Sequence, residues 1–284
     1  MNSTMKFYVL LLVTFFLSAC QTPLTSSGDE ILVNSPPEKR VALVIGNANY
    51  SKPINPLKSP LKDADDMSQS LQRLGFEVTL LKDAGKQEMD KAIEAFGQKL
   101  GKKTAAFFYF SGHGMQNNRK NFLLPVDMSL TEDSTAKFSE TVGLEQVLAT
   151  MKPAEIQIVA LDACRNYPIP LTKGIGTKPK TGLARMRANG AVISYATKPD
   201  QVSWDGRDAG KNSYYTKHLK KLLLEPGLTI EQVFQKVRSA VVAETSQENL
   251  KQQWPIEENL LRGGEFYFIP PVDEERYIIL PPVN

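Results

Sequence analysis

Runs of apolar residues alternate along the chain with segments in which apolar residues recur every three or four positions. The first run, Val41–Ile45, is closed by Gly46 and Asn47. Similar runs follow at Phe76–Leu81, Ala105–Phe110, Ile156–Leu161 and Ala191–Ala196. Continuous apolar runs of this length are typical of strands buried on both faces, so we expect a buried strand at each of these places.

The segments between the runs have the period of an amphipathic helix. They cover Leu61–Leu74, Met89–Leu100 and Val142–Met151. Thr229 and Gln232 can form a capping box, which predicts a last long helix beyond them. Strands that alternate with helices predict an α/β sandwich, in which helices cover both faces of a mostly parallel sheet. Glu265–Ile269 is a candidate edge strand.

The N-terminus carries a secretion pattern. Lys6 precedes the apolar run Phe7–Ala19, which is shorter than the roughly 20 residues that a membrane-spanning helix needs. The run ends in Leu-Ser-Ala-Cys at Cys20, which resembles the lipobox of bacterial lipoproteins. The resemblance implies that Cys20 is acylated and anchors the protein to a bacterial membrane; an ordinary signal peptide with a chance cysteine is the alternative. Gln21 in place of aspartate favours the outer membrane by enterobacterial sorting rules, with the protein facing the periplasm or the cell surface.

Composition divides the rest of the chain. We expect a signal peptide over residues 1–19, a flexible tether of small and polar residues over 20–39, a folded domain over 40–269 and a proline-containing tail over 270–284.

Charge and cysteine content exclude several classes of function. The chain has 34 basic and 31 acidic residues, so no strong positive field indicates a nucleic-acid partner. Two cysteines outside any C-x-x-C pair argue against a disulfide framework and a structural zinc site. The stretch after Gly46 lacks the G-x-G-x-x-G spacing of dinucleotide-binding folds.

Two predicted strands lead into residues that can do chemistry. The strand ending at Phe110 runs into His113 and Gly114, and the strand ending at Leu161 runs into Cys164. If these parallel strands are neighbours, His113 and Cys164 share one cleft, where an imidazole can activate a thiol as nucleophile. The backbone amides of Gly114 and Cys164 are then candidate donors to an oxyanion. Taken singly, such a histidine is about as often a turn residue, and such a cysteine is more often a small buried apolar residue.

The other histidine offers no comparable pattern. His218 lies among Lys217, Lys220 and Lys221 in a segment predicted to be a solvent-facing helix, and we assign it no chemical role.

At this point the sequence resembles a known family, the caspase-like clan C14 cysteine peptidases, especially bacterial caspase-domain proteins of metacaspase or orthocaspase type. The resemblance covers Arg40 to Phe268 and is carried by Val44–Asn47 with Tyr50, by Tyr109–Gly114 and by Leu161–Asn166. The spacing of 51 residues (164 − 113) between histidine and cysteine also fits the caspase signature, in which the histidine lies about 50 residues before the cysteine. The resemblance implies a three-layer sandwich with a central sheet of about six strands and cysteine endopeptidase activity on peptide or protein substrates.

Substrate preference follows from the resemblance. Asp162 stands two residues before the cysteine, as in metacaspases, and Asp63 matches a second pocket aspartate of that group. These matches imply cleavage after Arg or Lys, because a buried carboxylate pairs with a cation. Asp63 is equally explained as a carboxylate near a helix N-terminus. Ser194 and Tyr195 match the segment that lines the substrate groove, while Ser203–Asp205 reads either as a pocket wall or as a solvated loop.

Two further alternatives remain open from the sequence. Related enzymes often need calcium, and Asp127 lies near where ligands are expected, but no full acidic set can be matched and the metal ligands are unknown. The chemistry itself requires no cofactor. The alternative function is a caspase-fold envelope lipoprotein that acts as a binding or scaffold module with little or no proteolysis.

Overall fold

The computed structural model describes residues 37–52, 54–129, 138–164, 183–184, 186, 189–199, 203–206, 210–248, 250–261 and 264–272, with Cys164 described by its backbone alone. The strands are β1 (Lys39–Gly46), β2 (Glu77–Lys82), β3 (Thr104–Asn117), β4 (Lys120–Leu123), β5 (Val142–Gly143), β6 (Ile156–Cys164), β7 (Ala191–Tyr195) and β8 (Ile256–Asn259). The helices are α1 (Pro60–Arg73), α2 (Lys86–Gln98), α3 (Leu144–Met151), α4 (Tyr214–Leu222) and α5 (Ile230–Gln247), with a single 3-10 turn, η1 (Phe138–Glu140).

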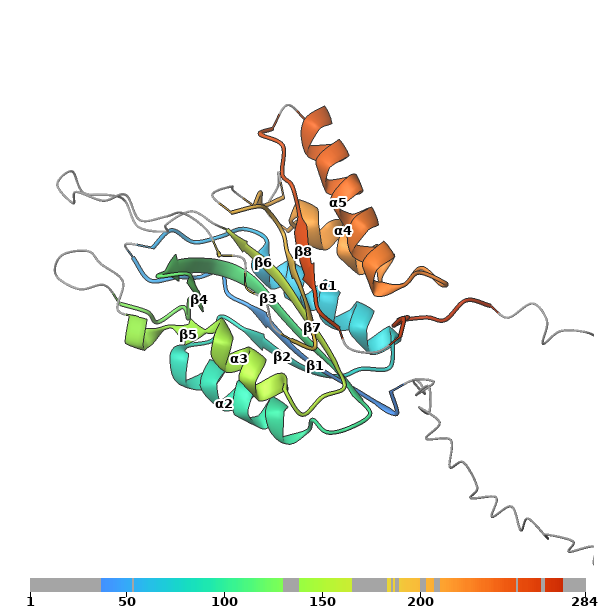
Figure 1. Cartoon of the computed structure of the whole chain (residues 1–284). Coiled ribbons are helices and arrows are strands. Elements are labelled where there is room, and N and C mark those ends of the chain that lie inside the picture. Colours follow the sequence, from blue (N-terminus) through green and yellow to red (C-terminus); the bar gives the residue numbers. More distant parts are fainter. Residues whose placement is uncertain are drawn as a thin grey trace, which may run out of the picture. The chain divides into compact units, whose positions relative to one another are not determined.

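The strands form one sheet in the order β2-β1-β3-β6-β7-β8, with β4 pairing to β3 and β5 to β4. Pairing is parallel from β2 through β7 and antiparallel where β8 closes one edge and β4 extends β3. Helices α1, α4 and α5 lie on one side of the sheet and α2 and α3 on the other (Figure 1). The predicted three-layer α/β sandwich with a mostly parallel sheet is therefore confirmed.

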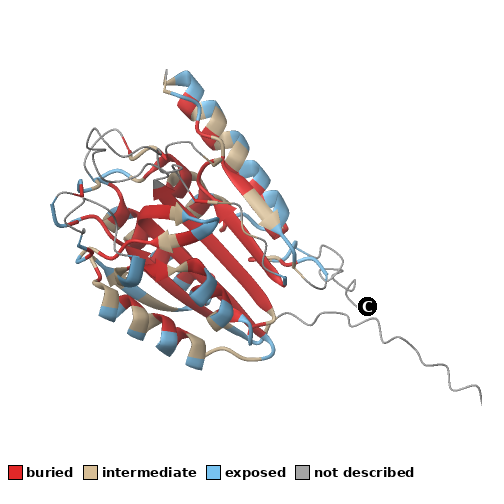
Figure 2. Cartoon of the chain, turned by 60° about the vertical axis from the view of Figure 1, so that its left-hand side comes forward, coloured by how far each residue is buried: buried red, intermediate tan, exposed pale blue. Residues whose placement is uncertain are grey.

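Alternate residues of each central strand face opposite helical layers. In β1, Val41, Leu43 and Ile45 join the core with α2 and α3, whereas Ala42 and Val44 join the core with α1, α4 and α5. Figure 2 shows the sheet as a buried layer, with helices exposed on their outer sides. Burial on both faces explains why these strands appear in the sequence as unbroken apolar runs.

Helix α1 packs directly against the end of β1. A side chain at Gly46 would place its Cβ 2.4 Å from the carbonyl oxygen of Pro60 and 2.6 Å from the Cβ of Ala64. The glycine that closes β1 therefore lets the first turn of α1, and with it Asp63, approach the carboxyl end of the sheet.

Three expectations about element boundaries need correction. Strand β3 continues beyond Phe110 to Asn117, because Ser111–His113 pair with β6 and Gly114–Asn117 pair with β4. Val142 and Gly143 form β5, so α3 begins only at Leu144. The sheet edge is β8, whereas Glu265–Ile269 makes only an isolated bridge at Tyr267 while its Phe266 and Phe268 pack into the core.

Among the described residues, the helices are all too short or too polar to span a lipid bilayer.

Candidate active site

The two candidate catalytic residues lie opposite each other on adjacent strands. Strands β3 and β6 run parallel, and their register pairs Ser111 with Asp162, Gly112 with Ala163 and His113 with Cys164. Neighbouring strands are about 4.8 Å apart, so the two backbones meet at the carboxyl end of the sheet. Both residues belong to the strands themselves, because β3 and β6 extend further than the apolar runs indicate.

One ring nitrogen of His113 is engaged. Its Nε2 lies 2.8 Å from the backbone carbonyl oxygen of Asn55, which can only accept a hydrogen bond. Nε2 therefore carries the proton, and in the neutral ring Nδ1 is unprotonated. Nδ1 is buried and has no hydrogen-bond partner among the described residues. The site thus holds an unprotonated imidazole nitrogen in the tautomer of a general base.

The surroundings keep this imidazole neutral. His113 is 6% exposed, and burial lowers the pKa of its ring below the ordinary value. The hydrogen bond to Asn55 and the negative charge of Asp205 oppose that effect without cancelling it. A neutral ring near neutral pH is ready to accept a proton.

Asp63 projects from the first turn of α1 into the interior. Its Oδ1 accepts hydrogen bonds from the backbone amide of Ser213 and from Asn212 Nδ2, both at 3.0 Å, and its Oδ2 accepts one from Ser111 Oγ at 3.1 Å. The residue is fully buried. Its three donors come from two distant parts of the chain, strand β3 and the residues just before α4, so the carboxylate is held in a defined position.

Asp162 lies beside it at the end of β6. Its Oδ1 accepts a hydrogen bond from Ser203 Oγ at 3.0 Å, and its Oδ2 accepts from Thr216 Oγ1 at 2.7 Å and from Ser213 Oγ. Ser213 is also the N-cap of α4, where its side chain accepts from the Thr216 amide. One capping residue therefore holds both carboxylates at the positive end of a helix.

Burial makes the negative charge of both carboxylates unfavourable. Burial raises the pKa of Asp63 well above its ordinary value, and the neighbouring charge of Asp162 raises it further. Burial likewise raises the pKa of Asp162. The donors to both carboxylates are neutral hydroxyl and amide groups, and the described residues provide neither carboxylate with a Lys, Arg or His partner. A buried acidic pair of this kind favours an incoming cation.

The loop Ser203–Asp205 belongs to the same site. Ser203 Oγ donates a hydrogen bond to Asp162. The negative charge of Asp205 acts to raise the pKa of both Asp162 and His113. Asp205 Oδ2 also accepts a hydrogen bond from the backbone amide of Lys58 at 3.1 Å. Of the two interpretations that the sequence leaves open, these contacts favour a wall of the site.

Ser194 and Tyr195 lie near the site with their side chains committed elsewhere. Ser194 Oγ accepts a hydrogen bond from Tyr215 at 2.6 Å, and the Tyr195 hydroxyl accepts one from the Met186 amide at 3.2 Å. Both residues are buried in β7. Any contact that they make with an extended ligand would come from their backbone.

Leu183 lies next to Gly114. Leu183 is buried, and its Cδ2 would lie 3.0 Å from a Cβ at Gly114. Asn121 holds the next residue, Ala184, through two bonds between its side-chain amide and the Ala184 backbone, at 2.8 and 2.6 Å. The oxyanion donor proposed at Gly114 thus has an apolar neighbour on one side.

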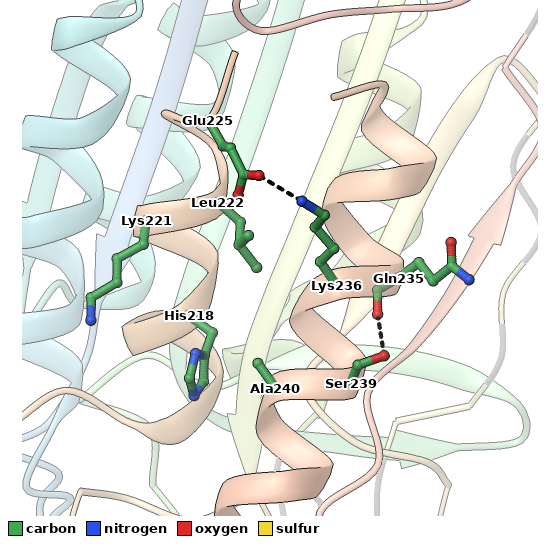
Figure 3. Close-up of a pocket in the computed structure, with 8 residues that line it drawn as sticks. All are labelled: His218, Lys221, Leu222, Glu225, Gln235, Lys236, Ser239 and Ala240. Carbon is green, nitrogen blue, oxygen red and sulfur yellow. Dashed lines mark hydrogen bonds and ion pairs between the residues drawn. The ribbon is translucent and has the colours of Figure 1, made fainter. Parts of the chain in front are cut away.

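His218 is half-buried, and so less exposed than the predicted solvent-facing helix position. Its Nε2 lies 2.6 Å from Glu244 on α5, and its side chain is 20% exposed. It borders a surface cavity of about 670 Å³ between α4 and α5, also lined by Lys221, Leu222, Glu225, Gln235, Lys236, Ser239 and Ala240. Figure 3 shows that Glu225 and Lys236 pair within this lining, as do Ser239 and the Gln235 backbone. None of the candidate catalytic or specificity residues lines this cavity.

Asp127 has a structural partner. Its Oδ1 accepts a hydrogen bond at 2.8 Å from the backbone amide of Lys86, the first residue of α2. Among the described residues there is no group of three or more side chains suited to hold a metal ion. Cys20 and the rest of residues 1–36 lie outside the described residues.

Sequence reasoning missed several residues of the site. Asn55 acts through its backbone carbonyl, so its side chain gave no signal. Asn121 stands in a short strand that carries no distinctive pattern. Ser213 was detectable, because a serine directly before a helical segment is a common N-cap.

Comparison with known proteins places these residues in context. The family model described as "Caspase domain" matches residues 39–263. The mucosa-associated lymphoid tissue lymphoma translocation protein 1 of Homo sapiens is 30% identical over 189 residues, which are 66% of this chain and 22% of that protein. Its Mus musculus homolog matches with the same identity and coverage. Caspase-1-A of Xenopus laevis is 22% identical over 251 residues, 82% of this chain and 63% of that protein. The chain spans about a fifth of the length of the first two relatives.

Proposed function

The chain belongs to the caspase-domain family of peptidases, and from this premise we propose that it is a cysteine endopeptidase in which Cys164 is the nucleophile and His113 its general base. The observation that carries the proposal is the register of β3 and β6, which pairs His113 with Cys164. The buried Nδ1 of His113, without a partner among the described residues, supports it.

The proposed reaction follows from these positions. Nδ1 of His113 takes the proton of the Cys164 thiol, and the sulfur attacks the carbonyl carbon of the scissile peptide bond. The backbone amides of Gly114 and Cys164 donate to the oxyanion that forms. The imidazolium then returns the proton to the leaving amine, and water hydrolyses the acyl-enzyme with His113 again as base. The Asn55 carbonyl accepts the Nε2 hydrogen bond in both the neutral ring and the imidazolium, so proton exchange takes place at Nδ1.

We propose that the acidic pair selects substrates with Arg or Lys before the cleaved bond. Asp63 and Asp162 are buried, and neither has a cationic partner among the described residues. A guanidinium or ammonium group entering between them would replace the repulsion of two anions by two ion pairs. An aspartate at the same substrate position would add a third negative charge.

The test compares three peptides that differ at the residue before the reporter group. The purified full chain is expected to hydrolyse Arg- and Lys-ending fluorogenic peptides and to leave the Asp-ending peptide essentially intact. Hydrolysis after Asp would contradict the specificity, and the absence of hydrolysis with all three peptides across pH and calcium would contradict the peptidase assignment in favour of a scaffold.

The lipid anchor is proposed from the sequence pattern that ends at Cys20. An acylated cysteine would hold the domain at the bacterial outer membrane and place its substrates in the cell envelope. Mass spectrometry of the mature N-terminal peptide is expected to show diacylglycerol on Cys20. A mature chain that begins at any other residue, without lipid, would refute the anchor.

A further inference from the structure

Tyr50 contacts His113 through both its hydroxyl and its ring. The backbone amide of His113 donates to the Tyr50 hydroxyl at 2.8 Å, and this hydroxyl donates in turn to the carbonyl oxygen of Leu124 at 3.2 Å. The two rings lie with their centroids 4.6 Å apart at an angle of 52°. Tyr50 is itself buried, so these contacts are shielded from water.

The strand is shaped to admit this hydroxyl. A side chain at Gly112 would place its Cβ 2.6 Å from the Tyr50 oxygen, so any other residue there would displace the tyrosine. The glycine before the histidine thus makes room for Tyr50. Leu124 follows β4, and its own amide donates to the His113 carbonyl at 3.0 Å. The hydroxyl therefore joins β3 to the chain after β4 at the position of the catalytic base.

The same segment also holds the far side of the imidazole. Asn55, five residues after Tyr50, accepts the hydrogen bond from Nε2. Ile54 packs with Tyr50, Met115 and Leu124 in a small apolar cluster, which fixes the segment against the sheet. Tyr50 therefore contacts the backbone and the ring face of His113, and Asn55 binds its Nε2, which leaves Nδ1 as the nitrogen without a partner among the described residues.

We propose that Tyr50 is a positioning residue for His113: its hydroxyl and ring hold the imidazole where Nε2 meets the Asn55 carbonyl and Nδ1 faces the nucleophile. The inference rests on the proposed peptidase function for its kinetic consequence, but its structural content stands apart from activity. A small rotation of the ring would move Nδ1 out of line with the nucleophile and would also break the hydrogen bond between Nε2 and the Asn55 carbonyl.

The kinetic test uses two substitutions. Tyr50→Phe keeps the ring and removes the hydroxyl, and Tyr50→Leu removes both. We expect kcat on the Arg-ending peptide to fall roughly tenfold and roughly a hundredfold respectively, with KM unchanged, because the acidic pair that binds the substrate is untouched. An unchanged kcat in Tyr50→Phe, or a rise in KM without a fall in kcat, would overturn the proposal.

Tyr214→Phe is the matched control. Tyr214 is also buried and its hydroxyl donates to Glu248, so this change removes a comparable hydrogen bond between α4 and α5. It should lower the melting temperature as Tyr50→Phe does, while leaving kcat near that of the unaltered chain. Equal losses of kcat in both variants would show that Tyr50 matters only for stability.

A second measurement does not depend on catalysis. The chain has only two histidines, so ¹⁵N-histidine labelling gives two rings, and His218→Gln identifies the signals of His113. We expect a single Nε2–H tautomer in the unaltered chain and a mixture of tautomers in Tyr50→Phe. If no peptide is cleaved, the proposed function fails while this spectrum still decides the role of Tyr50. An unchanged tautomer in Tyr50→Phe would refute the positioning.

Discussion

Replacement of Cys164 by alanine is expected to lower hydrolysis of the Arg-ending peptide by on the order of 10⁴-fold or more, to the background rate. The thiolate would form the covalent intermediate, and the strand register places Cys164 opposite His113. Loss of the whole covalent route is therefore a larger effect than loss of any single hydrogen bond. The measurement is kcat/KM on the fluorogenic peptide.

The two histidines provide the controls for this result. His113→Ala should reduce the rate to a similar extent, because the dyad acts as a unit and the losses do not add. His218→Ala should retain it, since His218 pairs with Glu244 on α5 and contacts none of the candidate catalytic residues among those described. Full activity in Cys164→Ala with an unchanged melting temperature would exclude this cysteine as the nucleophile.

Replacement of Asp63 by asparagine is expected to lower kcat/KM on Arg- and Lys-ending peptides by roughly a hundredfold or more, because one of two buried charges facing the substrate cation is lost. The geometry accommodates the amide. Its oxygen can keep the bonds from Ser213 and Asn212, and its nitrogen can donate to the Ser111 hydroxyl. The loss therefore reports charge, with little change in shape.

The same substitution should stabilise the protein without ligand. Burial raises the pKa of Asp63 well above the ordinary value, so ionisation of this carboxyl opposes folding as the pH rises toward and through the folded-state pKa. Asparagine stays neutral. Its advantage should be absent where the carboxyl is protonated in both states and should grow from the ordinary carboxyl pKa upward. Each kcal/mol corresponds to ~2–4 °C in melting temperature for a domain of this size.

Asp66→Asn is the control of opposite sign on the same helix. Burial alone would raise the pKa of Asp66, but bonds and charges from Lys220 and Lys62 lower it below the ordinary value. Its charge therefore stabilises the fold above that value, and asparagine should lower the melting temperature at neutral pH. Preference for Arg and Lys should persist. An Asp63→Asn variant with lowered stability and unchanged preference would contradict the proposed role of the acidic pair.

The local pattern of apolar and polar residues was sufficient to predict the layers of the fold. Apolar runs such as Val41–Ile45 locate strands buried on both faces, and the capping box at Thr229 and Gln232 marks the start of α5 as the structure has it. The predictions were wrong where pairing depends on distant residues. Glu265–Ile269 has strand-like alternation, yet the edge position is taken by β8, because a segment's partner is decided by packing and not by its own pattern.

The sequence by itself determined the residue types and family motifs around His113, Cys164, Asp162 and Asp63, because those signals lie within a few neighbouring positions. Only the tertiary structure brought His113 into register with Cys164 and gave its Nε2 the carbonyl of Asn55. It alone placed Asp63 of α1 and Asp162 of β6 on the single capping residue Ser213. The physical reason is that tautomer, burial and pKa depend on atoms contributed by segments far apart in the chain, which no local pattern contains.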